Sequence, residues 1–298
     1  MVPQAAKRKK PSSGMLAVAR DILISVGIVM LILASLYAYT GVWPPMVVIE
    51  SSSMMHGSDS EIGIIDTGDL TLVKSIHDRN DVVTYLEAMC ATDPNHGFKT
   101  YGDYGNVIVY RKNGLSETPV IHRAIAWVEY NATPSKPPDA YRGDIPDIGV
   151  YNVSEYTVYR LGYMNETITI DMQRIFTLSA ASTSHAPHSG FITKGDHNRG
   201  GTDQVSLTVT GGGSVEPVKA DWVVGKAEGE LPWFGLFKLW ISGQDTSTFP
   251  KTSVYGLVAT VFLLIAVPMA VDFILSRKKR KKEDRKQLRE RNRKNSLK

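Results

Sequence analysis

Three short segments of the chain hold side chains that could act together in nucleophilic catalysis. Residues 50–57 (ESSSMMHG) supply hydroxyls, residues 120–125 (VIHRAI) supply the imidazole of His122, and residues 193–204 (TKGDHNRGGTDQ) supply Asp196 and Asp203. A serine hydroxyl is a weak nucleophile until a neighbouring base takes its proton. Hydroxyl, imidazole and carboxylate follow one another in the chain order of a Ser-His-Asp triad. Taken singly, the serine and aspartate segments could also be ordinary polar loops. His122 alone could be a hydrogen-bonded histidine of the core.

The elements that must position these side chains read as short β-strands. Runs of β-branched and aromatic residues alternate with Gly, Asn, Asp and Pro turns. Alternation places His122 on one strand face with Val120 and Ala124, and Arg123 on the other. We therefore expect a mainly β domain, with a mixed or antiparallel sheet and barrel-like closure. The expected strands are 47–50, 70–74, 107–111, 120–128, 167–170, 191–193, 205–209 and 222–224, with surface insertions at 90–105 and 133–149.

Two uncharged stretches, residues 22–42 and 252–271, have 21 and 20 residues. Each matches the roughly 20 apolar residues that cross a bilayer core. Basic residues outside them give +5 over residues 1–20 and +10 over residues 277–298, so the total of +4 leaves −11 for the remainder. Lys and Arg mark cytoplasmic flanks. We expect a basic cytoplasmic tail (1–20), an uncleaved transmembrane anchor (21–43), an extracytoplasmic domain (44–251), a second transmembrane helix (252–275) and a basic cytoplasmic tail (276–298).

Composition also excludes several classes of protein. Cys90 is the only cysteine, which rules out a disulfide scaffold and a CxxC-type zinc site. The basic residues flank the apolar stretches, so we expect them to bind anionic lipids rather than nucleic acid. Asn-x-Ser/Thr triplets at Asn131, Asn152 and Asn165 are possible glycosylation sites. Aromatic residues within 231–240 (LPWFGLFKLW) favour the membrane surface.

The order of these segments resembles the type I signal peptidases, and most closely their archaeal and endoplasmic-reticulum branch. The resemblance covers residues 20 to 240 and rests on several boxes taken together. These are the anchor, an SxSM-type serine box, GDLTLV (68–73), GNVIVYR (105–111), the His-Arg strand, the GDxN loop with a further Asp, and WVVGKAEGELPWFG (222–235).

The resemblance implies a role for each residue of the site. Ser53 would be the nucleophile and His122 the general base, where bacterial relatives have a lysine. Asp203 would orient the imidazolium, with Asp196 building the loop or sharing that task. The backbone N–H of Ser53 and the hydroxyl of Ser51 would form the oxyanion hole. No cofactor or metal is implied.

The chain departs from the family pattern at two places. His56 stands where the family often has proline, and we expect a structural role for it. The spacing between Asp196 and Asp203 is one residue longer than usual, which leaves the choice of triad acid open. Met54 and Met55 either join the core or help the site to dip into the bilayer surface.

The expected function is a serine endopeptidase of the plasma membrane that cleaves signal peptides after small residues. Its partners would be preproteins, the lipid bilayer and the protein-export translocon. Two alternatives stay open. One is a hydrolase with a Ser/Lys dyad, using Lys74 or Lys99 as base. The other is a non-catalytic membrane receptor or assembly subunit that keeps the fold.

Overall fold

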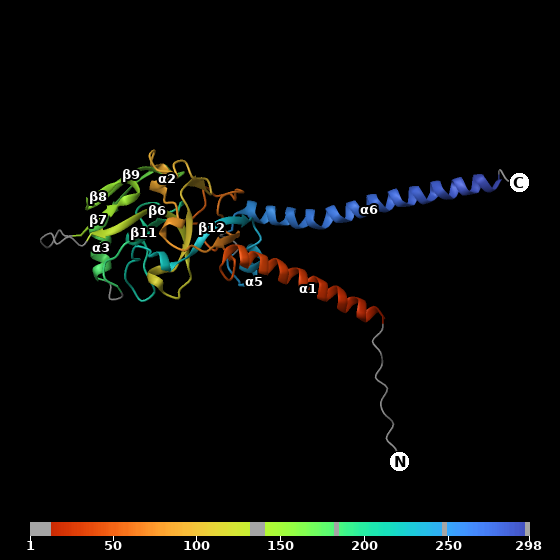
Figure 1. The fold of residues 1–298 in the computed structure, drawn as a ribbon, viewed down its shortest axis with the longest axis horizontal. Coiled ribbons are helices and arrows are strands. Elements are labelled where there is room, and N and C mark those ends of the chain that lie inside the picture. The colour runs from red at the N-terminus through yellow and green to blue at the C-terminus, as the bar shows by residue number, and fades with distance from the viewer. Residues whose placement is uncertain (1–12, 132–140, 182–184, 246–248, 296–298) are drawn as a thin grey trace, which may run out of the picture.

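The computed structural model describes residues 13–131, 141–181, 185–245 and 249–295. A β-rich domain occupies one end, and two long helices leave it on the same side (Figure 1). The strands are β1 Met46–Val48, β2 Leu70–Lys74, β3 Lys99–Thr100, β4 Asp103–Tyr104, β5 Val107–Tyr110, β6 Val120–Asn131, β7 Arg142–Ile145, β8 Val150–Val153, β9 Glu155–Leu161, β10 Glu166–Asp171, β11 Gly190–Lys194 and β12 Val223–Leu231. The helices are α1 Ser13–Thr40, α2 Tyr85–Met89, α3 Met172–Ala181, α4 Asp203–Ser206, α5 Leu236–Ile241 and α6 Lys251–Asn295, with 3-10 turns at Arg79–Asp81, Lys112–Gly114, Pro146–Ile148 and Ala220–Trp222.

The central sheet is antiparallel, with the order β1-β2-β12-β5-β6-β7-β8, and β11 pairs with β6. β6 is its longest strand and contacts three partners along its length. Strands β9 and β10 form a separate hairpin, and β3 and β4 another. Within the described part of the chain, β1 and β8 end the sheet without pairing with each other. The antiparallel sheet is as expected, and the expected barrel-like closure is not confirmed.

The two faces of the sheet carry different cores. His122 shares its face with Ile108, Tyr110 and Ala124, as alternation predicts, and these three residues pack with Phe191. On the opposite side Ile125 joins a cluster with α3 and the β9–β10 hairpin. Met54 packs with Ile49, Ile65 and Val107, so the serine segment rests on its own part of the core.

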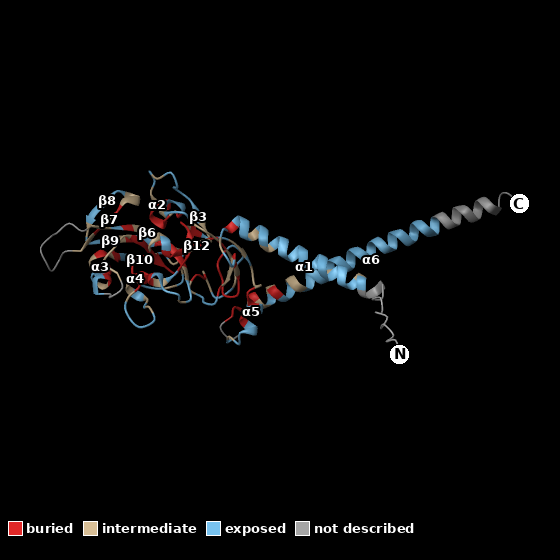
Figure 2. Ribbon diagram, turned by 60° about the horizontal axis from the view of Figure 1, so that its bottom comes forward, coloured by how far each residue is buried: buried red, intermediate tan, exposed pale blue. Residues whose placement is uncertain are grey.

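Helices α1 and α6 are long and apolar enough to cross a membrane, over Leu16–Thr40 and Lys251–Arg285. Both are exposed along most of their length, and burial is concentrated in the β-rich domain (Figure 2). Gly41 ends α1 in a left-handed conformation (φ 68°), and its N–H donates to the Tyr37 carbonyl. Pro268 lies inside α6, a position that membrane helices tolerate.

Two sequence expectations about the domain are wrong. Residues 205–209 were expected as a strand, but α4 covers Asp203–Ser206 and its Thr202 cap begins a helical turn. The 133–149 insertion was expected on the surface, yet β7 lies within it and pairs with β6 and β8. Ile145 of β7 is fully buried, because the strand closes one edge of the core against α3.

Candidate active site

His122 and Asp203 form a buried hydrogen-bonded pair. Nδ1 of His122 lies 2.6 Å from Oδ2 of Asp203, and both side chains are almost inaccessible to solvent. His122 is at the centre of the sheet, where β6 pairs with β5 at Ile108. Asp203 opens α4 and reaches the sheet from the loop that follows β11. An imidazole bound to a carboxylate through Nδ1 can use Nε2 to exchange a proton.

Two further side chains support Asp203 from neighbouring strands. The Tyr110 hydroxyl on β5 donates to Oδ2 at 2.9 Å, and the Thr193 hydroxyl on β11 donates at 2.7 Å. Burial alone would raise the pKa of Asp203, but the His122 charge and these hydrogen bonds lower it below its ordinary value. Asp203 is therefore an anion, held in place by hydrogen bonds from three strands.

Ser53 lies against the same loop that carries Asp196. Its carbonyl oxygen accepts a hydrogen bond from the His197 N–H at 2.8 Å. A methyl group built on Gly195 would lie 2.7 Å from the Ser53 oxygen and 2.8 Å from Nε2 of His122. The Ser53 carbonyl and Nε2 of His122 therefore both lie next to Gly195, and a larger side chain would not fit at this position.

A groove of about 750 Å³ opens beside Ser53 and His122. Ser51 lines it too, with its hydroxyl 3.2 Å from the Ser53 hydroxyl. Most of its other lining is apolar and comes from β1, β5 and the start of β6. A groove of this kind fits an extended apolar segment, with a hydroxyl and an imidazole in its wall.

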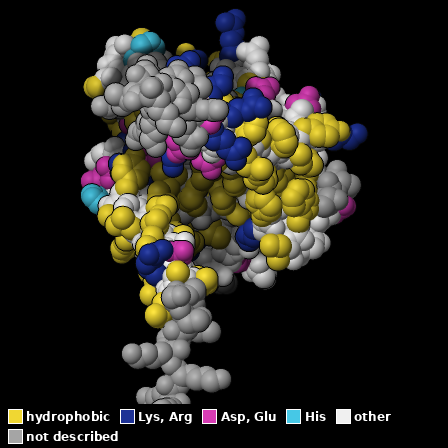
Figure 3. All heavy atoms as spheres, turned by 90° about the vertical axis from the view of Figure 1, so that its right-hand side faces the viewer, with side chains coloured by type: hydrophobic (Ala, Val, Ile, Leu, Met, Phe, Trp, Pro, Cys, Tyr) yellow, Lys and Arg dark blue, Asp and Glu magenta, His cyan; other side chains and the backbone are white. Residues whose placement is uncertain are grey.

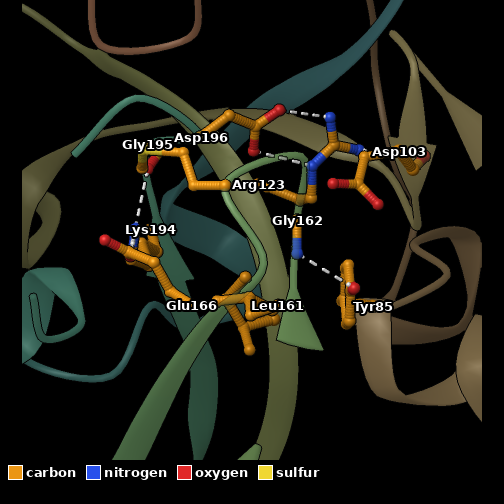
Figure 4. Close-up of a pocket in the computed structure, with 11 residues that line it drawn as sticks. Tyr85, Asp103, Arg123, Leu161, Gly162, Glu166, Lys194, Gly195 and Asp196 are labelled. Atoms are coloured by element: carbon orange, nitrogen blue, oxygen red, sulfur yellow. Dashed lines mark hydrogen bonds and ion pairs between the residues drawn. The ribbon is translucent and has the colours of Figure 1, made fainter. Parts of the chain in front are cut away.

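Asp196 belongs to a different pair. Arg123, next to His122 on β6 but on the other face, donates from Nε and Nη2 to the two Asp196 oxygens at 2.8 and 2.6 Å. Burial would raise the pKa of Asp196, but Arg123 and then His56 lower it. Figure 4 shows this ion pair beside Asp103 and Lys194. The remaining Arg123 nitrogen, Nη1, donates to the carbonyls of residues 100 and 103–105, so the pair links that segment to the loop of Asp196.

The other sequence candidates lie elsewhere. Lys74 lies over the Tyr39 ring at 4.9 Å and Lys99 over the Tyr104 ring at 4.3 Å. Among the residues described around the groove, the lysines are Lys112 and Lys238. Met54 and Met55 are buried, so both belong to the core.

The three candidate glycosylation sites differ in setting. Asn152 on β8 and Asn165 in the β9–β10 turn are exposed. Asn131 ends β6, and the threonine of its triplet lies outside the described residues.

The end of the domain from which α1 and α6 leave is rich in exposed apolar side chains (Figure 3). Helix α5 packs Leu236 and Leu239 against α6, while Phe237, Trp240 and Ile241 point outward. Lys238 of α5 lines the groove and lies 2.9 Å from Glu50, just before the serine segment. The groove therefore extends toward the end of the domain that carries the two long helices.

Sequence reasoning missed the side chains that support the pair. Tyr110 pairs with Val120 on the His122 face, so strand alternation across β5 and β6 could have found it. Thr193 precedes the GDxN loop and could have been found the same way. Gly195 carries no sequence signal for its role, because that role depends on two distant segments meeting there. Within the described part of the chain, no group of three His, Cys, Asp or Glu side chains could hold a metal ion.

No family model, no curated protein and no solved structure matches the chain.

Proposed function

We propose that this chain is a membrane-anchored serine endopeptidase of the signal peptidase type, which removes signal peptides from exported preproteins. The observation that supports it best is the buried His122–Asp203 pair, whose Nε2 lies next to Gly195, as does the Ser53 carbonyl, at the wall of an apolar groove. Ser53, His122 and Asp203 would then act as nucleophile, base and orienting acid.

In the proposed reaction His122 Nε2 takes the Ser53 hydroxyl proton as Oγ attacks the scissile carbonyl carbon. The oxyanion would accept hydrogen bonds from the Ser53 N–H and the Ser51 hydroxyl. His122 then gives its proton to the leaving nitrogen, the C–N bond breaks and an ester remains on Ser53. Water, losing a proton to His122, attacks the ester and frees Ser53 and the new carboxylate. Asp203 stays ionised throughout and stabilises the imidazolium.

Substrate would lie extended in the groove. Strand β1 is an edge strand, and a peptide beside it could add to the sheet through main-chain hydrogen bonds. Shallow pockets would favour small residues before the cleaved bond. The exposed aromatic face of α5 would keep the groove at the bilayer surface, where signal peptides are found.

The proposed topology places both basic tails in the cytoplasm and the β-rich domain outside the plasma membrane. Protease added to intact cells or right-side-out vesicles should then cut the domain and spare an epitope on the C-terminal tail. Loss of that epitope would contradict the two-span arrangement.

A cleavage assay tests the activity. Detergent-solubilised full chain is incubated with a preprotein that has small residues before its cleavage site. Ser53→Ala should abolish processing, and the neighbouring Ser52→Ala should process like the wild type. Equal processing by wild type and Ser53→Ala, or none by either, would favour a non-catalytic receptor or assembly subunit. Normal processing by His122→Ala, with loss in Lys74→Ala or Lys99→Ala, would favour the Ser/Lys dyad.

A further inference from the structure

A second imidazole, that of His56, belongs to the serine segment itself and lies outside the His122–Asp203 pair. Nε2 of His56 is 3.1 Å from Oδ2 of Asp196. The opposite partner of His56 is Tyr163, whose ring is stacked on the imidazole with centroids 4.3 Å apart and planes 18° from parallel. His56 is thus held by a charge on one side and an aromatic face on the other.

Tyr163 also contacts the loop that holds Ser53. Its hydroxyl is 2.5 Å from Nδ1 of His197, and its ring lies nearly parallel to that imidazole at 6.3 Å. Partial burial and then the charges of Asp196 and Glu166 raise the pKa of Tyr163, so the hydroxyl keeps its proton and can donate to Nδ1. The three rings therefore form a short stack of His56, Tyr163 and His197.

The stack contacts both ends of the turn that begins at Ser53. The His197 N–H binds the Ser53 carbonyl, and His56 follows Ser53 by three residues. The turn between them is tightened by the Met55 N–H, which donates to the Ser52 carbonyl, and Met54 and Met55 are buried beneath it. One end of the turn is thus fixed by His197 and the other by His56, and Tyr163 contacts both.

The part of the chain that supplies Tyr163 is remote from the catalytic strands. Tyr163 is at the tip of the β9–β10 hairpin, which forms no ladder with the central sheet in the described residues. The tip is fixed by Tyr85 of α2, whose hydroxyl accepts from the Gly162 N–H at 3.1 Å (Figure 4). The hairpin has its own core contacts and presents Tyr163 at a defined place.

We propose that His56 and Tyr163 are positioning residues that hold Ser53 in line with His122. This inference rests on the proposed function of Ser53 as nucleophile. Neither side chain contacts the reacting atoms; they act by fixing the turn of residues 53–56 against the 195–198 loop. A small displacement of a nucleophile has a large effect on rate, since about 1 Å can cost roughly a hundredfold.

The first test separates chemistry from binding. Tyr163→Leu removes both the ring stack and the hydroxyl, and should lower kcat and the rate of Ser53 labelling by a small fluorophosphonate about ten- to a hundredfold. The KM for preprotein and the melting temperature should stay near those of the wild type. Tyr163→Phe keeps the stack and should recover most of the labelling rate. His56→Ala should resemble Tyr163→Leu, and Tyr159→Leu, on the same hairpin and exposed, is the matched control.

The second test does not need catalysis. Amide hydrogen exchange over residues 50–57 of the full-length protein in detergent should become faster in Tyr163→Leu and stay unchanged in Tyr159→Leu. Wild-type labelling and exchange rates in Tyr163→Leu would overturn the proposal, as would a large fall in its melting temperature. If the wild type neither cleaves preprotein nor reacts at Ser53, the proposed function fails, and the exchange result alone decides whether Tyr163 fixes the turn.

Discussion

The two ends of the loop between β11 and α4 carry the same side chain in opposite settings. Asp196, at its start, binds Arg123, and Asp203, at its end, binds His122. His122 and Arg123 are neighbours on β6, and strand alternation sends them to opposite faces. A permanently charged guanidinium thus holds one aspartate, and an imidazole, which can both accept and donate a proton, holds the other. The Arg123–Asp196 pair can stabilise the loop, and the His122–Asp203 pair can take part in proton transfer.

The largest effect should come from neutralising each of the two aspartates in turn. Asp203→Asn should lower kcat on preprotein about 10³–10⁴-fold, because a neutral amide no longer stabilises the imidazolium or fixes its tautomer. Asp196→Asn, measured per folded molecule, should lose at most about a hundredfold, since Asp196 contacts the serine turn only through His56. Equal losses in the two variants would remove the functional distinction between them.

Removal of the permanent cation should affect stability more than chemistry. Arg123→Met leaves Asp196 buried without its main partner and frees the loop carbonyls that Nη1 binds. Breaking a buried pair in this way costs about 3–5 kcal/mol, or roughly 10 °C in melting temperature. His122→Gln is the comparison on the other face, and we expect a smaller fall because Asp203 keeps its hydrogen bonds from Tyr110 and Thr193. Thermal melts in detergent would compare the two, and the reverse order would contradict the assignment.

The region where the two halves of the site meet offers a steric test. Gly195→Ala places a methyl group against the Ser53 carbonyl and Nε2 of His122. The displaced serine should lower kcat by about a hundredfold with little change in the Asp196–Arg123 pair. Gly57→Ala should retain wild-type activity, because its methyl group would lie 4.0 Å from the nearest atom, the backbone nitrogen of Asp59. Near-normal cleavage by Gly195→Ala would mean that the serine does not act from this position.

A third buried carboxylate, Asp69, has no cation as partner among the described residues. Burial raises its pKa from 3.8 to about 7, although N–H groups of Trp233 and Asp66 oppose the shift. Folding therefore favours its protonated form, and that stabilisation is lost as the pH rises from about 4 to 7. The lowered pKa values of Asp196 and Asp203 have the opposite sign, with stability lost as the pH falls.

Asp69→Asn should sharpen this contrast. The amide is neutral at every pH, so the melting temperature of the variant should gain on the wild type between pH 4 and 7, the interval set by the Asp69 shift. We expect a difference of a few degrees, at about 2–4 °C for each kcal/mol. Parallel curves for the two proteins would show that Asp69 does not titrate in this range.

Local patterns predicted much of the scaffold. Residues 70–74 form β2 as expected, and the alternation that placed His122 apart from Arg123 is confirmed. The α4 turn was missed because residues 205–209 (VSLTV) alternate apolar and polar side chains, a pattern that predicts a strand. The helical turn there also brings Asp203 back toward the sheet.

The partners of each aspartate were beyond the reach of local patterns. The resemblance favoured Asp203 as the triad acid, but its spacing from Asp196 left the choice open. The difference between their settings comes from packing of the loop on β6. The same holds for Tyr163, which reaches His56 from a hairpin more than 100 residues away in the chain. Contacts of this kind depend on the tertiary arrangement and leave no periodic signal.

The position of strand β6 in the sheet determines how easily local unfolding can expose the residues of the site. It is hydrogen-bonded to β5, β7 and β11, so its middle residues are among the last that a local fluctuation can expose. His122 and Arg123 lie in that stretch. Their amide protons should exchange only when the whole sheet opens, whereas the serine turn can open in smaller steps. The free energy needed to expose His122 is thus close to that of unfolding the whole sheet. The position of Ser53 depends instead on the few contacts of its turn.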